Sequence, residues 1–147
     1  MNEEIVTNSF EETQKLGEKI GSDLKTGAIL ALFGNLGSGK TTFVQGLAKG
    51  QGIKKRIISP TFIIVRNYEL GIRNQEVKIF YHVDLYRVEN EKEVQGLGIE
   101  EILNDQKSII AIEWAEKIKE LLPKKRIEIY FEYIDENKRK ITVRKYE

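Results

Sequence analysis

The sequence contains no cysteine and a single histidine, His82. The absence of cysteine excludes disulfide bonds, catalysis by a thiolate and cysteine-ligated zinc, and it agrees with a reducing compartment. One histidine in a chain without cysteine cannot form a zinc site. Thiol chemistry and zinc binding are therefore excluded as functions.

The sequence also lacks an excess of charge of either sign and a long apolar run. Lys and Arg number 24 against 23 Asp and Glu, so neither a basic field for nucleic acid nor an acidic, disordered composition is present. No apolar run approaches the roughly 20 residues of a membrane span, and the N-terminus is acidic where a signal peptide is basic. We expect a soluble, cytoplasmic protein with one domain over residues 1–147.

One short segment carries a motif. Residues 34–41 read GNLGSGKT and fit G-x-x-x-x-G-K-[ST], a loop whose backbone N–H groups wrap around the phosphates of a nucleotide. Residues 28–33 before it are apolar without alternation, as in a strand covered on both faces, and residues 40–49 after it predict a short helix ending at Gly50. Strand, loop and helix in this order are the context that the motif requires.

The loop predicts separate roles for its residues. Lys40 would neutralise the β- and γ-phosphates, and the Thr41 hydroxyl would be a Mg²⁺ ligand. Thr42, one residue into the helix, could reach the α-phosphate near the positive end of the helix dipole. The nucleotide-binding residues expected from the loop are Leu36, Gly37, Ser38, Gly39, Lys40, Thr41 and Thr42.

The rest of the chain predicts an α/β fold. Ser9-Phe-Glu-Glu12 has the form of a capping box that begins an amphipathic helix, which stops at Gly27. Residues 89–104 are charged and predict partly helical structure. Further strands are predicted at residues 62–68, 77–84, 108–113, 126–133 and 140–146. We expect a three-layer fold like that of P-loop nucleoside triphosphatases, with a mostly parallel central sheet, added antiparallel strands and helices on both faces.

Two acidic residues end predicted strands where a nucleotide site could use them. Magnesium beside a phosphate loop usually has a second carboxylate at the end of a neighbouring buried strand, and Glu113 is the only acid so placed. Asp84 could orient or activate the attacking water. An ordinary strand-end charge at Glu113 and a surface ion pair at Asp84 are the alternatives. We expect Lys40 and Glu113 to lie at a solvent-facing site, so that alanine at either position abolishes turnover without unfolding the protein.

Two further residues are candidates for the same site. Thr61, in the segment Ser59-Pro-Thr-Phe62, supplies a hydroxyl after a proline-fixed turn, where it could sense the γ-phosphate. Ordinary turn chemistry explains this segment equally well. Trp114 follows Glu113 and is either a core or interface residue or a wall of the nucleotide pocket.

The residues alone leave several functions open. A small-molecule kinase could use Asp84 as its base, although no arginine-rich lid segment lies between the middle strands. A GTPase is disfavoured because Asn137-Lys-Arg-Lys140 lacks the Asp of the guanine-reading N-K-x-D pattern. A nucleotide-dependent binding module is also possible, since no clear arginine finger is present in cis and turnover should be slow without a partner. Direct RNA contact is possible through the basic runs at residues 54–56, 124–126 and 138–140.

Taken together, these segments resemble the bacterial TsaE-type ATPase family. The resemblance covers Thr13-Gln-Lys-Leu-Gly-Glu18 and the segments GNLGSGKTT, SPTF, HVDLYR, GLGIEEIL and IEWAEK, and leaves out only the charged tail. The phosphate loop is common to many proteins, whereas SPTF followed by H-x-D-L-Y-R and then I-E-W is specific to this group. Glu113 in place of the usual Asp is also that family's pattern.

The resemblance implies a function in tRNA modification. It implies a Mg²⁺-dependent ATPase, slow alone, that is required for threonylcarbamoyladenosine (t6A) formation while a separate transferase with a paralogous partner subunit performs the transfer. By match, Lys40 and Thr41 would bind phosphate and Mg²⁺, Glu113 would be the second Mg²⁺ group, and Asp84 and Thr61 would serve hydrolysis and switching. It further implies that Thr13 lies near the adenine and that Trp114 is functionally sensitive.

Overall fold

The computed structural model of the chain describes residues 2–25, 27–35, 37–58, 64–70 and 79–147. Within these ranges, no helix is both long enough and apolar enough to cross a membrane. The strands are β1 (Asn2–Thr7), β2 (Ala28–Phe33), β3 (Val65–Glu69), β4 (Ile79–Asp84), β5 (Ser108–Glu113), β6 (Arg126–Tyr133) and β7 (Arg139–Tyr146). The helices are α1 (Phe10–Asp23), α2 (Lys40–Gly50), α3 (Glu91–Gln95), α4 (Ile99–Leu103) and the 3₁₀ helix η1 (Ala115–Leu121).

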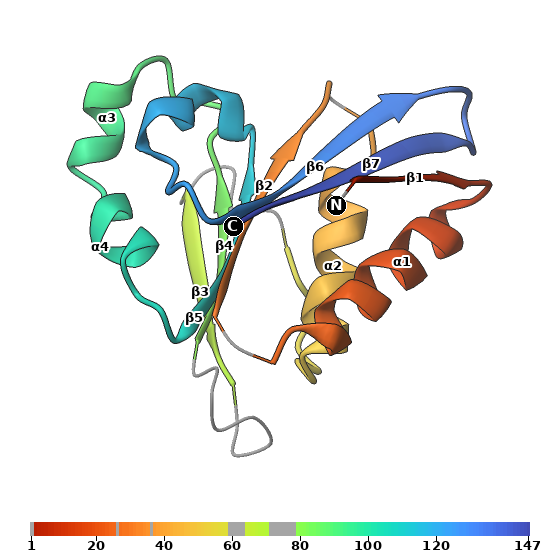
Figure 1. The fold of residues 1–147 in the computed structure, drawn as a ribbon, viewed down its shortest axis with the longest axis horizontal. Coiled ribbons are helices and arrows are strands. Elements are labelled where there is room, and N and C mark those ends of the chain that lie inside the picture. Colours follow the sequence, from red (N-terminus) through yellow and green to blue (C-terminus); the bar gives the residue numbers. More distant parts are fainter. Residues whose placement is uncertain (1, 26, 36, 59–63, 71–78) are drawn as a thin grey trace.

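The described strands form one seven-stranded sheet in the order β1-β7-β6-β2-β5-β4-β3 (Figure 1). β2 pairs in parallel with both β5 and β6, and β4 pairs in parallel with β5. β3 is antiparallel to β4 at one edge, while β7 and β1 extend the other edge in antiparallel pairs. The predicted sheet, with a parallel centre and added antiparallel strands, is confirmed.

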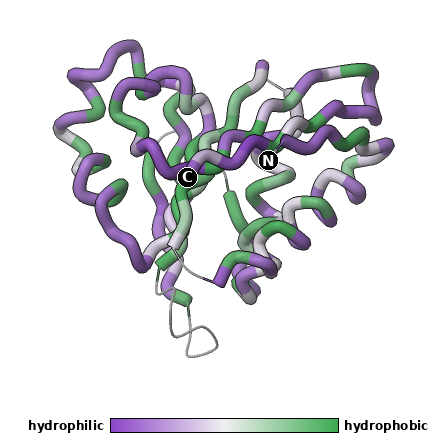
Figure 2. The backbone as a smooth tube through the Cα atoms, in the orientation of Figure 1, coloured by the Kyte–Doolittle hydropathy of each residue, from purple (hydrophilic) through white to green (hydrophobic). Residues whose placement is uncertain are grey.

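Helices cover both faces of the sheet, as predicted. α1 and α2 lie on one face, and α3, α4 and η1 lie on the other (Figure 1). Each face has its own core of buried apolar side chains, one centred on Phe43, Leu47 and Phe80 and the other on Leu85 and Ile118. Figure 2 shows that apolar residues concentrate along the central strands, whereas α3 and α4 are largely hydrophilic outside. β5 is buried along its whole length, which explains its continuous apolar sequence.

The N-terminus of α1 forms much as the capping pattern predicts, with one difference. The Ser9 hydroxyl accepts a hydrogen bond from the backbone N–H of Glu12 at 3.1 Å. The Glu12 carboxylate, however, accepts from the backbone N–H of Asn8 at 3.2 Å, one residue before the cap. Both interactions satisfy backbone donors at the helix entrance.

α1 and α2 approach each other closely because glycines line their interface. A Cβ atom at Gly17 would overlap the carbonyl oxygen of Phe43 on α2, and one at Gly46 would overlap that of Gln14 on α1. Gly21 and Gly50 repeat this arrangement one helical turn further on. The two backbones therefore pack against each other with no room for side chains between them.

Two elements were not predicted. No strand was predicted at Asn2–Thr7, but this segment pairs antiparallel with β7 as the edge strand of the sheet. Its side chains are mostly exposed, so no alternation of buried residues marks it as a strand. η1 follows Trp114, whose φ of 61° places it in the left-handed region.

Candidate functional site

The phosphate loop connects the end of β2 to the start of α2. Gly37 and Gly39 have φ of 78° and 103°, which side-chain-bearing residues rarely adopt, and Gly39 is the N-cap of α2. The first N–H groups of α2 have no partner within the helix and can point at an anion. Leu36, predicted as part of this loop, lies outside the described residues.

The strand register brings Asp84 and Glu113 to the same end of the sheet as the loop. Asp84 is the register partner of Glu113 in the β4–β5 pair, and Leu32, at the end of β2, is the partner of Glu113 on the other side. The Thr41 Oγ1 lies 2.9 Å and 3.1 Å from the two carboxylate oxygens of Glu113 and donates to them. The two residues predicted to bind Mg²⁺ are thus brought together.

A buried histidine holds the Glu113 carboxylate from the other side. His82 Nε2 lies 2.5 Å from Glu113 Oε2, and because a carboxylate can only accept, the imidazole donates. Neither side chain is open to solvent, with exposed fractions of 0% for His82 and 3% for Glu113. The expectation that Glu113 faces solvent was therefore wrong, since its position at the end of a buried strand places it under neighbouring side chains.

Lys40 lies beside these groups and is also buried, with an exposed fraction of 5%, so its expected solvent exposure was wrong as well. Its Nζ donates to the carbonyl oxygen of Gly34 and lies 3.6 Å from the centre of the Trp114 ring. Burial lowers the pKa of the Lys40 ammonium, and nearby carboxylates, Glu113 foremost, partly oppose that shift. Trp114 therefore forms a wall of the site rather than part of the core alone.

These residues surround a cavity of about 290 Å³. It is lined by Gly37, Ser38, Gly39, Lys40, Thr41, Thr42, Asp84, Tyr86, Glu113, Trp114 and Arg139. Asp84 is held in place by the backbone N–H of Tyr86, which donates to its Oδ1 at 3.0 Å. The predicted loop residues that the structure describes, both carboxylates and Trp114 are thus gathered around one space.

Sequence reasoning missed His82, Tyr86 and Arg139 as parts of this site. Arg139, at the start of β7, donates from Nη2 to the Gly37 carbonyl oxygen at 3.1 Å. Only the pairing of β6 with β7 brings it to the loop, so no local pattern could indicate this position. The sequence did hold an indication for His82, because residues two apart on a strand lie on the same face, and His82 is two residues before Asp84.

Thr13 and Thr61, the two remaining predicted site residues, are not among the described residues that line the cavity. Thr13 is buried on α1, its hydroxyl 2.7 Å from that of Thr7, and its methyl group lies near Gly39 of the loop. It does not line the cavity itself. Thr61 lies outside the described residues, so its switching role stays a prediction.

The chemistry of the cavity fits magnesium rather than a softer metal. Its possible ligands are a hydroxyl and two carboxylates, which are hard oxygen donors. Among the described residues, no group of three or more His, Cys, Asp or Glu side chains is arranged to hold a metal. Magnesium needs no such cage, because it usually binds one or two protein carboxylates together with water and substrate phosphates.

Comparison with known proteins identifies the family of this chain. Residues 7–141 match the family model described as "Threonylcarbamoyl adenosine biosynthesis protein TsaE". That match runs through β6 into β7.

Curated relatives and a solved structure match over most of the chain. A Bacillus subtilis protein named "tRNA threonylcarbamoyladenosine biosynthesis protein TsaE" is 39% identical over 132 residues, 90% of this chain and 78% of its own. A Rickettsia felis protein of the same name is 42% identical over 136 residues, 92% of this chain and 75% of its own. The crystal structure of Bacillus subtilis YdiB superposes with a TM-score of 0.79 at 31% identity, covering 100% of this chain and 87% of that one. The chain belongs to the TsaE family and has its P-loop nucleoside triphosphatase-like fold.

Proposed function

We propose that this chain acts as one P-loop ATPase domain over residues 1–147, binding ATP with Mg²⁺ and hydrolysing it in the service of tRNA threonylcarbamoyladenosine biosynthesis. Family membership supports the biosynthetic role and a nucleotide-binding site. In this proposal a separate transferase with a paralogous partner subunit carries out the transfer, and ATP hydrolysis by this chain resets that complex. tRNA is reached indirectly, through the complex.

The contact between Thr41 and Glu113 is the observation that supports this function most directly. It joins the first turn of α2 to the end of β5 at 2.9 Å, next to the N–H groups of the phosphate loop. A hydroxyl and a carboxylate at this place are the protein groups that a magnesium nucleotide uses in P-loop sites. Magnesium bound there would neutralise charge on the β- and γ-phosphates.

The proposed function requires the Lys40 side chain to change its contacts when ATP binds. It now contacts the Gly34 carbonyl and the Trp114 ring, and to reach a γ-phosphate its side chain must leave that ring. The lowered pKa of its ammonium reflects the cost of burial, which a phosphate would offset by direct charge pairing. Trp114 therefore holds the lysine close to the place where it acts.

The remaining residues position the reacting water and its surroundings. Asp84 lines the cavity, and the Tyr86 N–H fixes one of its oxygens, so its carboxylate can orient a water molecule near the γ-phosphate. His82 keeps the Glu113 carboxylate in place. These residues bind and orient, and none forms a covalent bond to phosphate.

We expect the isolated chain to hydrolyse ATP slowly because of how the arginine of the phosphate cavity is placed. Of the described cavity residues, Arg139 is the sole arginine, and it donates to the Gly37 carbonyl and to the carbonyl of Lys138 at 3.0 Å. An arginine tied to backbone carbonyls is not placed to stabilise charge on a transferring phosphoryl group, which elsewhere raises turnover by about 10³–10⁵. We therefore assign the stabilisation of this charge to a partner protein.

The test is phosphate release from ATP with Mg²⁺ by the purified chain, alone and with the transferase and its paralogous subunit from the same organism. We expect slow release alone, strong stimulation by both partners and loss of both rates in Lys40→Met. A Lys19→Met variant, changed at an exposed lysine of α1 that does not line the cavity, is the matched control. Formation of ADP only on addition of a small hydroxyl compound would instead indicate a kinase.

A further inference from the structure

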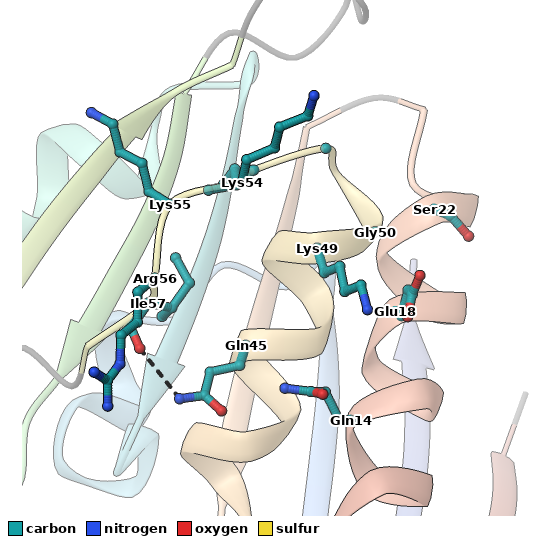
Figure 3. A pocket seen from close by; sticks show the side chains of 12 residues that line it. Gln14, Glu18, Ser22, Gln45, Lys49, Gly50, Lys54, Lys55, Arg56 and Ile57 are labelled. Atoms are coloured by element: carbon teal, nitrogen blue, oxygen red, sulfur yellow. Dashed lines mark hydrogen bonds and ion pairs between the residues drawn. The ribbon is translucent and has the colours of Figure 1, made fainter.

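A second and larger hollow lies on the same side of the sheet as α1 and α2. Its volume is about 790 Å³, against about 290 Å³ for the phosphate cavity. Figure 3 shows α2 along its middle, α1 on one side and the segment after α2 on the other. It is lined by Gln14, Glu18, Ser22, Gln45, Lys49, Gly50, Gly52, Ile53, Lys54, Lys55, Arg56 and Ile57, and we call it the α1–α2 groove.

The segment after α2, residues 53–57, forms the wall of the α1–α2 groove opposite α1 and is hydrogen-bonded to α2. Gln45 of α2 donates from Nε2 to the Ile57 carbonyl at 3.2 Å, a contact drawn in Figure 3. The Ile53 N–H donates to the Ala48 carbonyl at 3.0 Å, and Ile57 is buried in the core. The basic residues 54–56, between Ile53 and Ile57, are therefore held in a fixed position along the groove.

The groove is cationic although the chain as a whole is nearly neutral, with a net charge of +1. Lys54, Lys55 and Arg56 follow one another along its wall, and all three are exposed. Lys49 adds a fourth basic side chain, 3.9 Å from the Glu18 carboxylate of α1. A ligand of this surface must therefore carry negative charge.

We propose that the α1–α2 groove binds an acidic polypeptide segment of a partner protein. Extended RNA is a poorer fit, because the described lining residues include no aromatic side chain on which a base could stack. Amide side chains beside lysines suit a peptide, whose backbone takes hydrogen bonds while its carboxylates pair with the basic wall.

The position of the groove links it to the proposed ATP site, and only this link rests on the proposed function. α2 begins with Lys40 and Thr41 at the phosphate cavity and ends with Lys49 and Gly50 in the groove. A partner segment seated there touches the same short helix that holds the phosphates. The groove would thus be where the stimulating complex makes contact.

The experiment uses a second basic run as an internal control. Lys124-Lys-Arg126 repeats the sequence Lys54-Lys-Arg56, and Lys124 and Lys125 are likewise exposed but line neither hollow. Lys54→Glu/Lys55→Glu and Lys124→Glu/Lys125→Glu then carry the same net charge. The probe is a fluorescein-labelled peptide of alternating glutamate and alanine, with binding followed by anisotropy at low ionic strength.

We expect the wild type to bind the peptide, the groove variant to bind at least about tenfold more weakly and the control variant to match the wild type. Equal losses in both variants, or no binding by the wild type, would overturn the proposal. Tighter binding of polyuridylate RNA that is lost in the groove variant alone would overturn it in favour of an RNA groove.

A second readout separates this proposal from the ATPase itself. The groove variant should keep the basal phosphate release of the wild type and lose most of the stimulation by the transferase complex. Retained full stimulation would show that the complex docks elsewhere and would overturn the link. If the wild type releases no phosphate under any condition, the proposed function fails, while the peptide result still decides the groove.

Discussion

The Thr41 hydroxyl and the Glu113 carboxylate are hydrogen-bonded at 2.9 Å although 72 positions separate them in the sequence. Thr41 belongs to the first turn of α2, and Glu113 ends β5, the strand that pairs in parallel with β2. The contact therefore fixes the phosphate loop to the neighbouring strand at the edge where ligands of open parallel sheets bind. In the proposed function, this is the place where magnesium would bind.

Replacing Glu113 with glutamine should remove the charge and keep the shape of this side chain. We expect phosphate release to fall by about 100-fold, because the metal would lose the negative group that holds it. Binding of ATP without Mg²⁺ should change little, as measured by titration calorimetry. Glu120→Gln, an exposed change on η1, is the control and should behave as the wild type. Normal turnover by a folded Glu113→Gln protein would refute the assignment.

His82 would act only through Glu113. Replacing His82 should therefore raise the Mg²⁺ concentration that turnover requires rather than abolish turnover. His82→Leu removes the donor 2.5 Å from Glu113 Oε2 and should raise the Mg²⁺ concentration for half-maximal turnover by about 10–100-fold. His82→Gln, whose amide can still donate, should recover part of that loss. An unchanged Mg²⁺ requirement in both variants would mean that His82 serves packing alone.

The strand and helix on either side of the phosphate loop could be predicted because their signals are local. An apolar run, a glycine loop and a helix start lie next to each other between Ala28 and Gly50, and each is decided by near neighbours. Glu113 could be predicted because a strand buried on both faces ends in an acid. These signals need no knowledge of how distant strands pair.

The residues that could not be predicted depend on long-range pairing. Arg139 reaches Gly37 only through the hairpin of β6 and β7, and the His82–Glu113 contact needs the parallel register of β4 and β5. β1 was missed because an edge strand with mostly exposed side chains has no alternating pattern. The burial of Lys40 and Glu113 was missed because side chains from other elements, Trp114 among them, cover the strand ends.

The glycines between α1 and α2 give a test of packing. Gly46→Ala would place a methyl group against the Gln14 carbonyl, so the helices must separate, and we expect a loss of about 1–3 kcal/mol in the free energy of unfolding. Urea denaturation followed by circular dichroism measures it. Gly96→Ala is the matched control, because no heavy atom lies within 4 Å of the new methyl group and its φ of −78° suits alanine. Equal stabilities of the two variants would contradict the close packing.

The β6 strand gives a prediction for alkaline pH. Burial, together with the hydrogen bond that the Tyr130 hydroxyl donates to Glu128 at 2.5 Å, raises the pKa of Tyr130 to about 12. An unfolded tyrosine has a pKa of about 10, so between these values the native state binds more protons than the unfolded state. The stability contributed by this group is therefore present below pH 10 and is lost as the pH rises toward 12.

Thermal melts of the wild type and Tyr130→Phe between neutral and alkaline pH test this sign. The wild type should be the more stable at neutral pH, and the difference should shrink as the pH rises above about 10. A difference that stays constant over that range would show that the phenol titrates normally in the folded protein.

The fluorescence of Trp114 provides the most direct test of the nucleotide site, because the chain contains one tryptophan and its ring lies 3.6 Å from Lys40 Nζ. Titration with ATP in the presence of Mg²⁺ should give a saturable change in emission as Lys40 leaves the ring for the phosphates. In Lys40→Met the change should be absent or need far more ATP. A folded wild-type protein whose emission does not respond to Mg²⁺ and ATP would contradict the account.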